Sequence, residues 1–179
     1  LTWKKGTEHG FNPLTYSPKD LDEFDVPGYR YTVKSVFKYK NFLDPLPYKG
    51  WLQYPNTALL TARGCTQKCL ICGGSKVAYV QNCGRNGLAL RSPAKLVEDI
   101  QFIQRFSRAP IFILHDIRQA GVKYVDEFFD RLKKINLKNE LVFELFQYAD
   151  EKYYKKIHDS VPKYSIEFTL ETHDSKLRR

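Results

Sequence analysis

The sequence contains no methionine and only four cysteines among its 179 residues. Four cysteines are too few to staple a chain of this length with disulfides. Uncharged apolar runs are also short, for example residues 109–114, whereas a membrane-spanning helix needs roughly 20 such residues. The first residues carry no signal-peptide pattern. We therefore expect a soluble, cytoplasmic protein with no membrane partner. Because the chain begins at Leu1 and lacks methionine, we also expect a fragment or a processed chain.

The sequence has no dense run of lysine or arginine, although 29 basic residues outnumber 20 acidic ones and give a net charge of +9. A basic surface can bind nucleic acid or phosphate groups. Without a dense run, solvated charge scattered over the surface is the favoured interpretation. We therefore expect a small-molecule substrate in preference to a nucleic acid.

Proline divides the chain into two parts, because six of the nine prolines lie before residue 57. Prolines at this density, together with the aromatic stretch 29–37, favour an extended segment with one short strand. We interpret residues 1–56 as an irregular, proline-rich N-terminal extension or interdomain connector. Residues 57–179 then belong to a separate domain.

From residue 57, short apolar runs alternate with amphipathic stretches, which is typical of βα units and a parallel sheet. The predicted strands are 57–62, 111–114, 141–146 and 164–171. The fold class is therefore α/β. The βα repeat ends after about the fourth strand, with only eight residues following it.

Three amphipathic helices are expected between these strands. The first begins with Ser92 as the N-cap and Pro93 at the first helical position. The third spans about 150–160. The predicted apolar faces of the first two helices are Leu96, Val97, Ile100, Ile103 and Phe106, and then Val125, Phe128, Phe129 and Leu132.

Side chains alternate along a strand, so the last two predicted strands each have a polar face. Glu144 lies opposite Phe143 and Leu145. In the strand 164–171, residues Ser165, Glu167, Thr169 and Glu171 share one face. If helices cover the apolar faces, these carboxylates line the inside of a barrel or open cup and indicate a ligand cavity. A polar face that is simply solvated is the alternative.

Three of the four cysteines, Cys65, Cys69 and Cys72, form a C-x3-C-x2-C loop directly after the first predicted strand. Clustered thiolates select zinc or an iron–sulfur cluster. Three thiolates can hold three irons of a [4Fe-4S] cube and leave the fourth iron open for chemistry. The alternative is a structural zinc site that Cys83 closes as the fourth thiolate.

This loop resembles the hallmark of the radical SAM superfamily, in which it follows the first strand of a partial (βα) barrel. The resemblance implies that Cys65, Cys69 and Cys72 ligate a [4Fe-4S] cluster and that S-adenosylmethionine (SAM) chelates the open iron. It also implies an enzyme that cleaves SAM to a 5′-deoxyadenosyl radical and needs an electron donor as a partner. For residues 57–179 we thus expect the N-terminal part of such a barrel, truncated after about the fourth strand.

Further stretches resemble the subgroup of this superfamily that follows a cobalamin (B12)-binding domain. They are the proline-rich lead-in and residues 63–65, 73–75 and 166–174. The subgroup implies a cobalamin-assisted methyltransferase or a related C–C or C–S bond-forming enzyme. Cobalamin would be held outside this chain, because no Asp-x-His-x-x-Gly motif occurs in it.

The resemblance also assigns four residues to SAM. Ile71, at a position that is usually aromatic in the family, would pack near the adenine. Asp116 would receive the SAM amino group in place of the usual Gly-Gly-Glu. Glu144 and Glu171, at the ends of later strands, would accept hydrogen bonds from the amino group or the ribose hydroxyls. His115, at the end of a strand, is expected to be a hydrogen-bonded structural residue, and a role as proton donor or ligand is the alternative.

Two other function classes stay open. One is an RNA-binding module stabilised by zinc or a cluster, and the other is an RNA-modifying radical SAM enzyme. RNA binding that weakens steeply with added salt would distinguish them from an enzyme acting on a small molecule.

Overall fold

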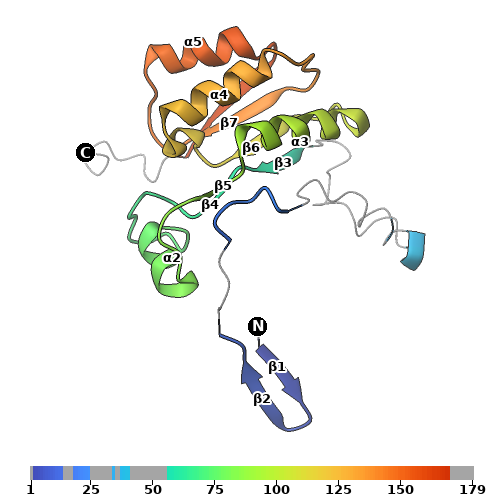
Figure 1. The fold of residues 1–179 in the computed structure, drawn as a ribbon, viewed down its shortest axis with the longest axis vertical. Helices are drawn as coiled ribbons and strands as arrows, with labels where there is room; N and C mark the ends of the chain where they lie inside the picture. The colour runs from blue at the N-terminus through green and yellow to red at the C-terminus, as the bar shows by residue number, and fades with distance from the viewer. Residues whose placement is uncertain (1, 14–17, 25–33, 35–36, 41–55, 170–179) are drawn as a thin grey trace.

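The computed structural model describes residues 2–13, 18–24, 34, 37–40 and 56–169. Its centre is a parallel sheet of four strands in the order β3-β6-β7-β8 (Figure 1). These strands are β3 (Thr57–Leu60), β6 (Ile111–Leu114), β7 (Leu141–Leu145) and β8 (Tyr164–Phe168). The predicted α/β class and parallel sheet are confirmed. Over the described residues the sheet is open and does not close into a barrel.

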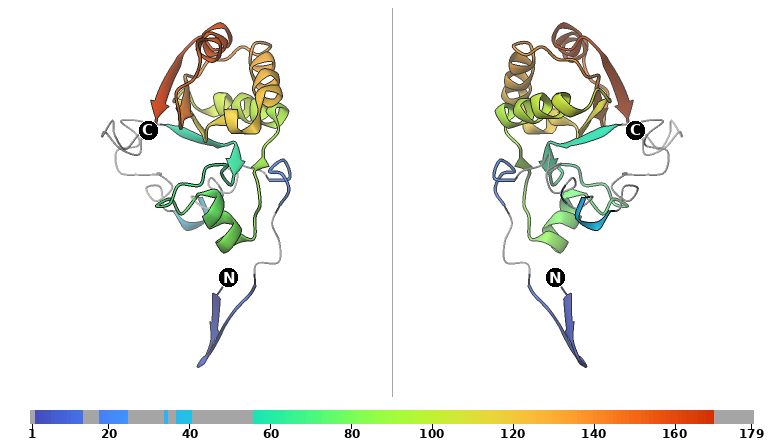
Figure 2. Two further views of the ribbon diagram at one scale, coloured as in Figure 1. Left: turned by 90° about the vertical axis from the view of Figure 1, so that its left-hand side faces the viewer. Right: turned by 90° about the vertical axis from the view of Figure 1, so that its right-hand side faces the viewer.

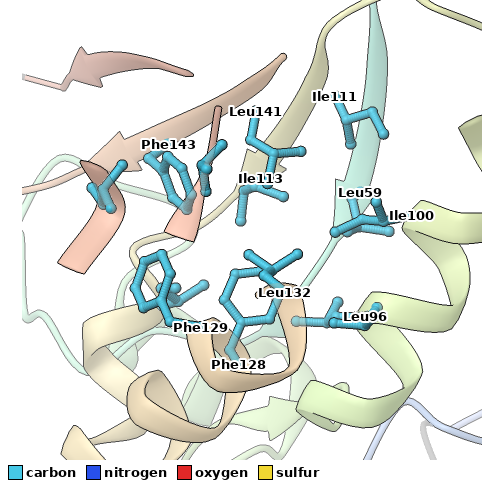
Figure 3. Close-up of a cluster of buried hydrophobic side chains, with 14 of the residues drawn as sticks. Leu59, Leu96, Ile100, Ile111, Ile113, Phe128, Phe129, Leu132, Leu141 and Phe143 are labelled. Atoms are coloured by element: carbon cyan, nitrogen blue, oxygen red, sulfur yellow. The ribbon is translucent and has the colours of Figure 1, made fainter. Parts of the chain in front are cut away.

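Helices α3 (Pro93–Phe106), α4 (Val122–Leu132) and α5 (Glu151–Ser160) cover one face of this sheet (Figure 2). Along β6, the fully buried Ile111 and Ile113 alternate with the half-buried Phe112 and Leu114. Each large apolar side chain buried in this way contributes about 1.5–3 kcal/mol. The core between the sheet and the helices (Figure 3) includes Leu59, Leu96, Ile100, Ile111, Ile113, Phe128, Phe129, Leu132, Leu141 and Phe143.

The opposite face of the sheet carries two of the predicted carboxylates, Glu144 and Glu167. Glu144 on β7 pairs in register with Glu167 on β8, so both lie on this face. Toward β3 and β6 the same face is apolar and bears the half-buried Leu60, Phe112 and Leu114. The polar face is therefore confined to β7 and β8.

The helix α3 begins at the predicted cap Ser92, and α5 begins directly after Asp150, the first residue of the range expected for it. The Ser92 hydroxyl accepts the Lys95 N–H at 3.2 Å, and the Asp150 carboxylate accepts the Tyr153 N–H at 2.9 Å. The placement of Phe106 on the buried face of α3 is wrong, because 69% of this side chain is exposed. Phe106 is the last residue of the helix, and its ring lies against Phe102, with 5.0 Å between the ring centroids.

The predicted strand 57–62 is divided in the structure. β3 ends at Leu60, and β4 (Ala62–Arg63) turns away to pair antiparallel with β5 (Ala89–Leu90). The buried Thr61 marks the division, because its hydroxyl donates to the Leu114 carbonyl while its own carbonyl accepts the Arg91 N–H at 2.8 Å. The chain thus leaves the sheet one residue after β3.

The N-terminal part differs most from expectation. Residues 2–13 contain a hairpin that no sequence pattern indicated, β1 (Thr2–Lys5) paired with β2 (Glu8–Phe11). It lies apart from the sheet in both views of Figure 2. Of the strand expected within 29–37, the described residues 34 and 37 are helical, so the expectation is wrong there, and the rest lies outside the described residues. No helix in the described part of the chain has the length and apolar character needed to cross a membrane.

Residues 18–24 pack against the sheet domain. The buried Leu21 donates its N–H to the Leu90 carbonyl at 2.9 Å. Arg91, only 1% exposed, donates to the carbonyls of Leu21 and Phe24 and forms an ion pair with the buried Asp99. This guanidinium therefore joins the N-terminal segment to β5 and α3.

Candidate metal and cofactor site

The loops that follow β4, β6 and β7 are joined by hydrogen bonds at the carboxyl edge of the parallel sheet. Ligands of α/β folds bind at this edge, where the strand-to-loop connections leave polar groups free. The chemistry-bearing residues in these loops and strand ends are Cys65, Thr66, Cys69, Cys72, His115, Asp116, Gln119 and Glu144.

The cysteine loop, residues 64–75, runs from β4 to α2 (Lys76–Cys83). Gly64 begins it with φ of +102°, and a Cβ atom there would lie 2.6 Å from the Gly87 carbonyl oxygen, so only glycine fits. At the other end, the Ser75 hydroxyl caps α2 by accepting the Ala78 N–H at 3.3 Å. The Lys76 N–H donates to the Gln67 carbonyl at 2.8 Å. Both ends of the loop are thus held, with the cysteines between them.

The sulfurs of Cys65 and Cys72 accept backbone hydrogen bonds. The Gln67 N–H donates to Cys65 Sγ and the Gly74 N–H donates to Cys72 Sγ, each at 3.3 Å. Such N–H···S bonds tune iron–sulfur ligands. None of the four cysteines is in a disulfide, and Cys72 is exposed. The donor set therefore fits a thiolate-bound metal or cluster in its chemistry.

The thiols are not gathered at coordination distance. Among the described residues, no three side chains of His, Cys, Asp or Glu lie close enough together to hold a metal ion. This finding covers both the three-cysteine arrangement and the zinc alternative with Cys83, which is the last residue of α2. Because metal binding is coupled to folding of the ligand loop, either arrangement requires the loop to close around the metal.

Ile71 lies at the outer part of this loop. Its side chain is 90% exposed, and the neighbouring Leu70 is fully exposed. Ile71 thus makes no core contact, and its contact with adenine stays a prediction.

Asp116 is the second residue after β6, and its buried carboxylate accepts hydrogen bonds from Arg118 and Phe146. One carboxylate oxygen accepts the Arg118 N–H at 3.1 Å and Arg118 Nε at 2.8 Å. The other accepts Arg118 Nη2 at 2.6 Å and the Phe146 N–H at 3.1 Å. These bonds cap the short helix η1 (Ile117–Ala120) and tie it to the end of β7. The hydrogen bonds that the Arg118 guanidinium donates to Asp116 also raise the pKa of Arg118. With four bonds already accepted, Asp116 could receive a ligand amino group only if one of them opened.

Glu144 has more acceptor capacity left. Its Oε2 accepts the His115 N–H at 2.7 Å and its Oε1 accepts the Thr169 hydroxyl at 3.2 Å. A carboxylate offers about four acceptor positions, so about two stay available for a ligand. Glu171, the other predicted carboxylate, lies outside the described residues.

His115 has a strained backbone at this edge, with φ of +79°, which is rare for a residue other than glycine. Its ring meets the Phe146 ring edge-on at 5.3 Å between centroids. Its Nε2 is buried and has no hydrogen-bond partner among the described residues. Burial lowers the pKa of His115, and the carboxylates of Asp116 and Glu144 oppose this only in part. The imidazole is therefore neutral at pH 7.

Three contributors to this edge were not predicted from the sequence: Thr66, Arg118 and Gln119. Gln119 reaches the cysteine loop, while Arg118 donates to the carbonyls of Gln147 and Tyr148 at 2.6 and 3.0 Å. No motif marks these residues. Thr66 and Gln119 are 53 residues apart, and the carbonyls that Arg118 binds in the loop after β7 are 29 and 30 residues from it.

No family model, curated protein or solved structure matches this chain. The function must therefore be argued from the residues and contacts of the chain itself.

Proposed function

We propose that this chain carries the cluster-binding part of a radical SAM enzyme, with Cys65, Cys69 and Cys72 as ligands of a [4Fe-4S] cluster. One observation carries the proposal: the C-x3-C-x2-C loop comes after β3, the first strand of the parallel sheet, and the short β4, and it contacts the helix η1 that follows β6. That position brings the thiol of Cys65 to the edge where α/β folds bind ligands, with Cys69 and Cys72 on the same loop. When bound, the cluster supplies the electron that cleaves SAM reductively.

Within this proposal, the carboxylates at the strand ends have different roles. Glu144 receives the SAM amino group or a ribose hydroxyl, because its acceptor positions are only partly used. Asp116 acts through η1, which its four hydrogen bonds hold in place beside the cysteine loop. Ile71 packs near the adenine when SAM binds, since it is an exposed apolar side chain next to the third cysteine.

Finer assignments also belong to the proposal. The sheet continues into a partial barrel. The reaction is a cobalamin-assisted methyl transfer. The protein works in the cytoplasm, where thiols stay reduced. The four cysteines, none of which is in a disulfide, support the last assignment. The substrate is a small molecule, because no dense basic run marks a nucleic-acid site.

The test is the metal content of the chain and of four single variants. After purification without oxygen and reconstitution with iron and sulfide, we expect about four irons and four sulfides per chain. Cys65→Ala, Cys69→Ala and Cys72→Ala each lose most of the iron, whereas the control Cys83→Ala keeps it. One zinc ion per chain that is lost in Cys83→Ala as well would contradict the proposal and establish the four-thiolate zinc site.

A further inference from the structure

The side chain of Gln119 connects the helix η1 to the cysteine loop by hydrogen bonds. Its Oε1 accepts the Thr66 N–H at 2.9 Å and the Thr66 hydroxyl at 2.7 Å. The Sγ atom of Cys65 lies 3.7 Å from both Oε1 and Nε2 of the same carboxamide. One side chain thus contacts the first cysteine of the motif and the residue that follows it.

The contact with Thr66 decides which way the carboxamide points. A backbone N–H can only donate, so the atom that it meets must be the carboxamide oxygen. The NH₂ group is then the branch that can donate to Cys65. A protonated Cys65 donates its S–H to Oε1, and a deprotonated Cys65 accepts from Nε2. Gln119 can therefore hydrogen bond to this cysteine both as a thiol and as a thiolate.

Hydrogen bonds in and around the helix η1 hold the backbone of Gln119 in place. The N–H of Gln119 donates to the Asp116 carbonyl at 3.0 Å, and the Asp116 carboxylate binds Arg118 and the Phe146 N–H. Asp116 is the second residue after β6, and Phe146 directly follows β7. The position of the carboxamide is thus set by the parallel sheet, whereas the cysteine loop itself is largely exposed.

We propose that Gln119 is a positioning residue for the cysteine loop. Its carboxamide holds Thr66 in place and donates a hydrogen bond to the Cys65 thiolate when the loop binds its metal. The effect on a cluster rests on the function proposed above, while the bond to Thr66 belongs to the chain alone. An N–H···S bond favours the electron-rich reduced cluster and raises its reduction potential. Residues that support metal ligands in this way typically change metal affinity by about 10- to 100-fold.

The first test needs no metal and reads the amide hydrogen exchange of Thr66 by NMR in the intact chain. In Gln119→Ala the Thr66 amide loses its acceptor, and we expect its exchange to become roughly three- to tenfold faster. The matched control is Gln104→Ala, because Gln104 also accepts a backbone N–H, that of Lys138 at 3.3 Å, near the amino end of β7. Unchanged Thr66 exchange in Gln119→Ala would overturn the proposal.

The second test compares the reconstituted clusters of the wild type, Gln119→Glu and Gln104→Glu by redox titration. Gln119→Glu keeps an oxygen for Thr66 but replaces the NH₂ donor with a negatively charged oxygen. We expect a more negative midpoint potential for Gln119→Glu and the wild-type value for Gln104→Glu. Equal potentials in all three would overturn the role toward the cluster. If the wild type holds no cluster, the proposed function fails. The amide exchange of Thr66 then still tests whether Gln119 holds Thr66 in place.

Discussion

The backbone N–H of His115 donates to the carboxylate of Glu144 at 2.7 Å, which joins the ends of β6 and β7. Glu144 is thus oriented by the backbone of the neighbouring strand and keeps acceptor positions on its other side. A carboxylate held in this way is preorganised for a ligand that carries an amino group or hydroxyls.

Glu144→Gln tests this assignment. The amide keeps the size of the side chain but removes its charge, so one charge-assisted hydrogen bond to SAM is lost, worth about 1.5–3 kcal/mol. We expect SAM to bind the reconstituted chain roughly 10- to 100-fold more weakly, as measured by equilibrium dialysis. Glu140→Gln is the control, because Glu140 directly precedes β7 at the opposite edge and accepts the Ser165 hydroxyl. Equal weakening by both substitutions would contradict a specific role for Glu144.

Asp116→Asn tests whether Asp116 holds η1 in place. The substitution weakens the four hydrogen bonds that the buried carboxylate accepts and removes its ion pair with Arg118. We expect the free energy of unfolding in urea to fall by about 2–3 kcal/mol. Asp126→Asn breaks only a half-exposed pair with Lys156, and should cost less than about 1 kcal/mol. Similar losses for the two variants would show that Asp116 has no special structural role.

Arg91→Ala tests the attachment of residues 18–24. The substitution removes the counter-charge of the buried Asp99 and the guanidinium donor that the carbonyls of Leu21 and Phe24 share. Breaking one side of a buried pair costs about 3–5 kcal/mol, which urea unfolding can measure. Arg131→Ala removes an exposed pair with Glu127 on α4 and should cost only about 0.3–0.5 kcal/mol. A loss below 1 kcal/mol for Arg91→Ala would refute the anchoring role.

The lowered pKa of His115 predicts how stability depends on pH. The folded chain binds a proton at His115 less readily than the unfolded chain does, so its contribution to stability is present above the ordinary pKa of 6.5. That contribution is lost as the pH falls from 6.5 toward the lower folded pKa. Asparagine tolerates the positive φ at this position. We therefore expect the variant His115→Asn to lose less stability between pH 7 and pH 5 than the wild type. The control His158→Asn, at an exposed position, should follow the wild type. A wild-type pH dependence in His115→Asn would contradict the burial argument.

Local patterns predicted the sheet domain well, because strand burial and helix caps depend on near neighbours in the sequence. The run 111–114 became β6 without a change of bounds, and Ser92 and Asp150 cap their helices. The division of the first strand at Thr61 was missed, since it depends on contacts with Leu114 and Arg91 far along the chain.

The candidate site was only partly predictable for the same reason. Thiol chemistry marks Cys65, Cys69 and Cys72 by type and spacing alone. The alternation of β7 placed Glu144 on the open face, opposite the buried Phe143 and Leu145. By contrast, Gln119 has no recognisable spacing to Thr66, which is 53 residues earlier. Only the folded sheet brings these two residues together.

The most direct test of the central claim is the EPR spectrum of the reduced, reconstituted chain with and without SAM. A [4Fe-4S] cluster held by three cysteines has one open iron, so SAM should change the spectrum of the wild type. The account predicts a cluster signal whose g-values shift when SAM is added, and no such signal in Cys72→Ala. A chain that forms no reducible cluster, or one whose cluster spectrum SAM leaves unchanged, would contradict it.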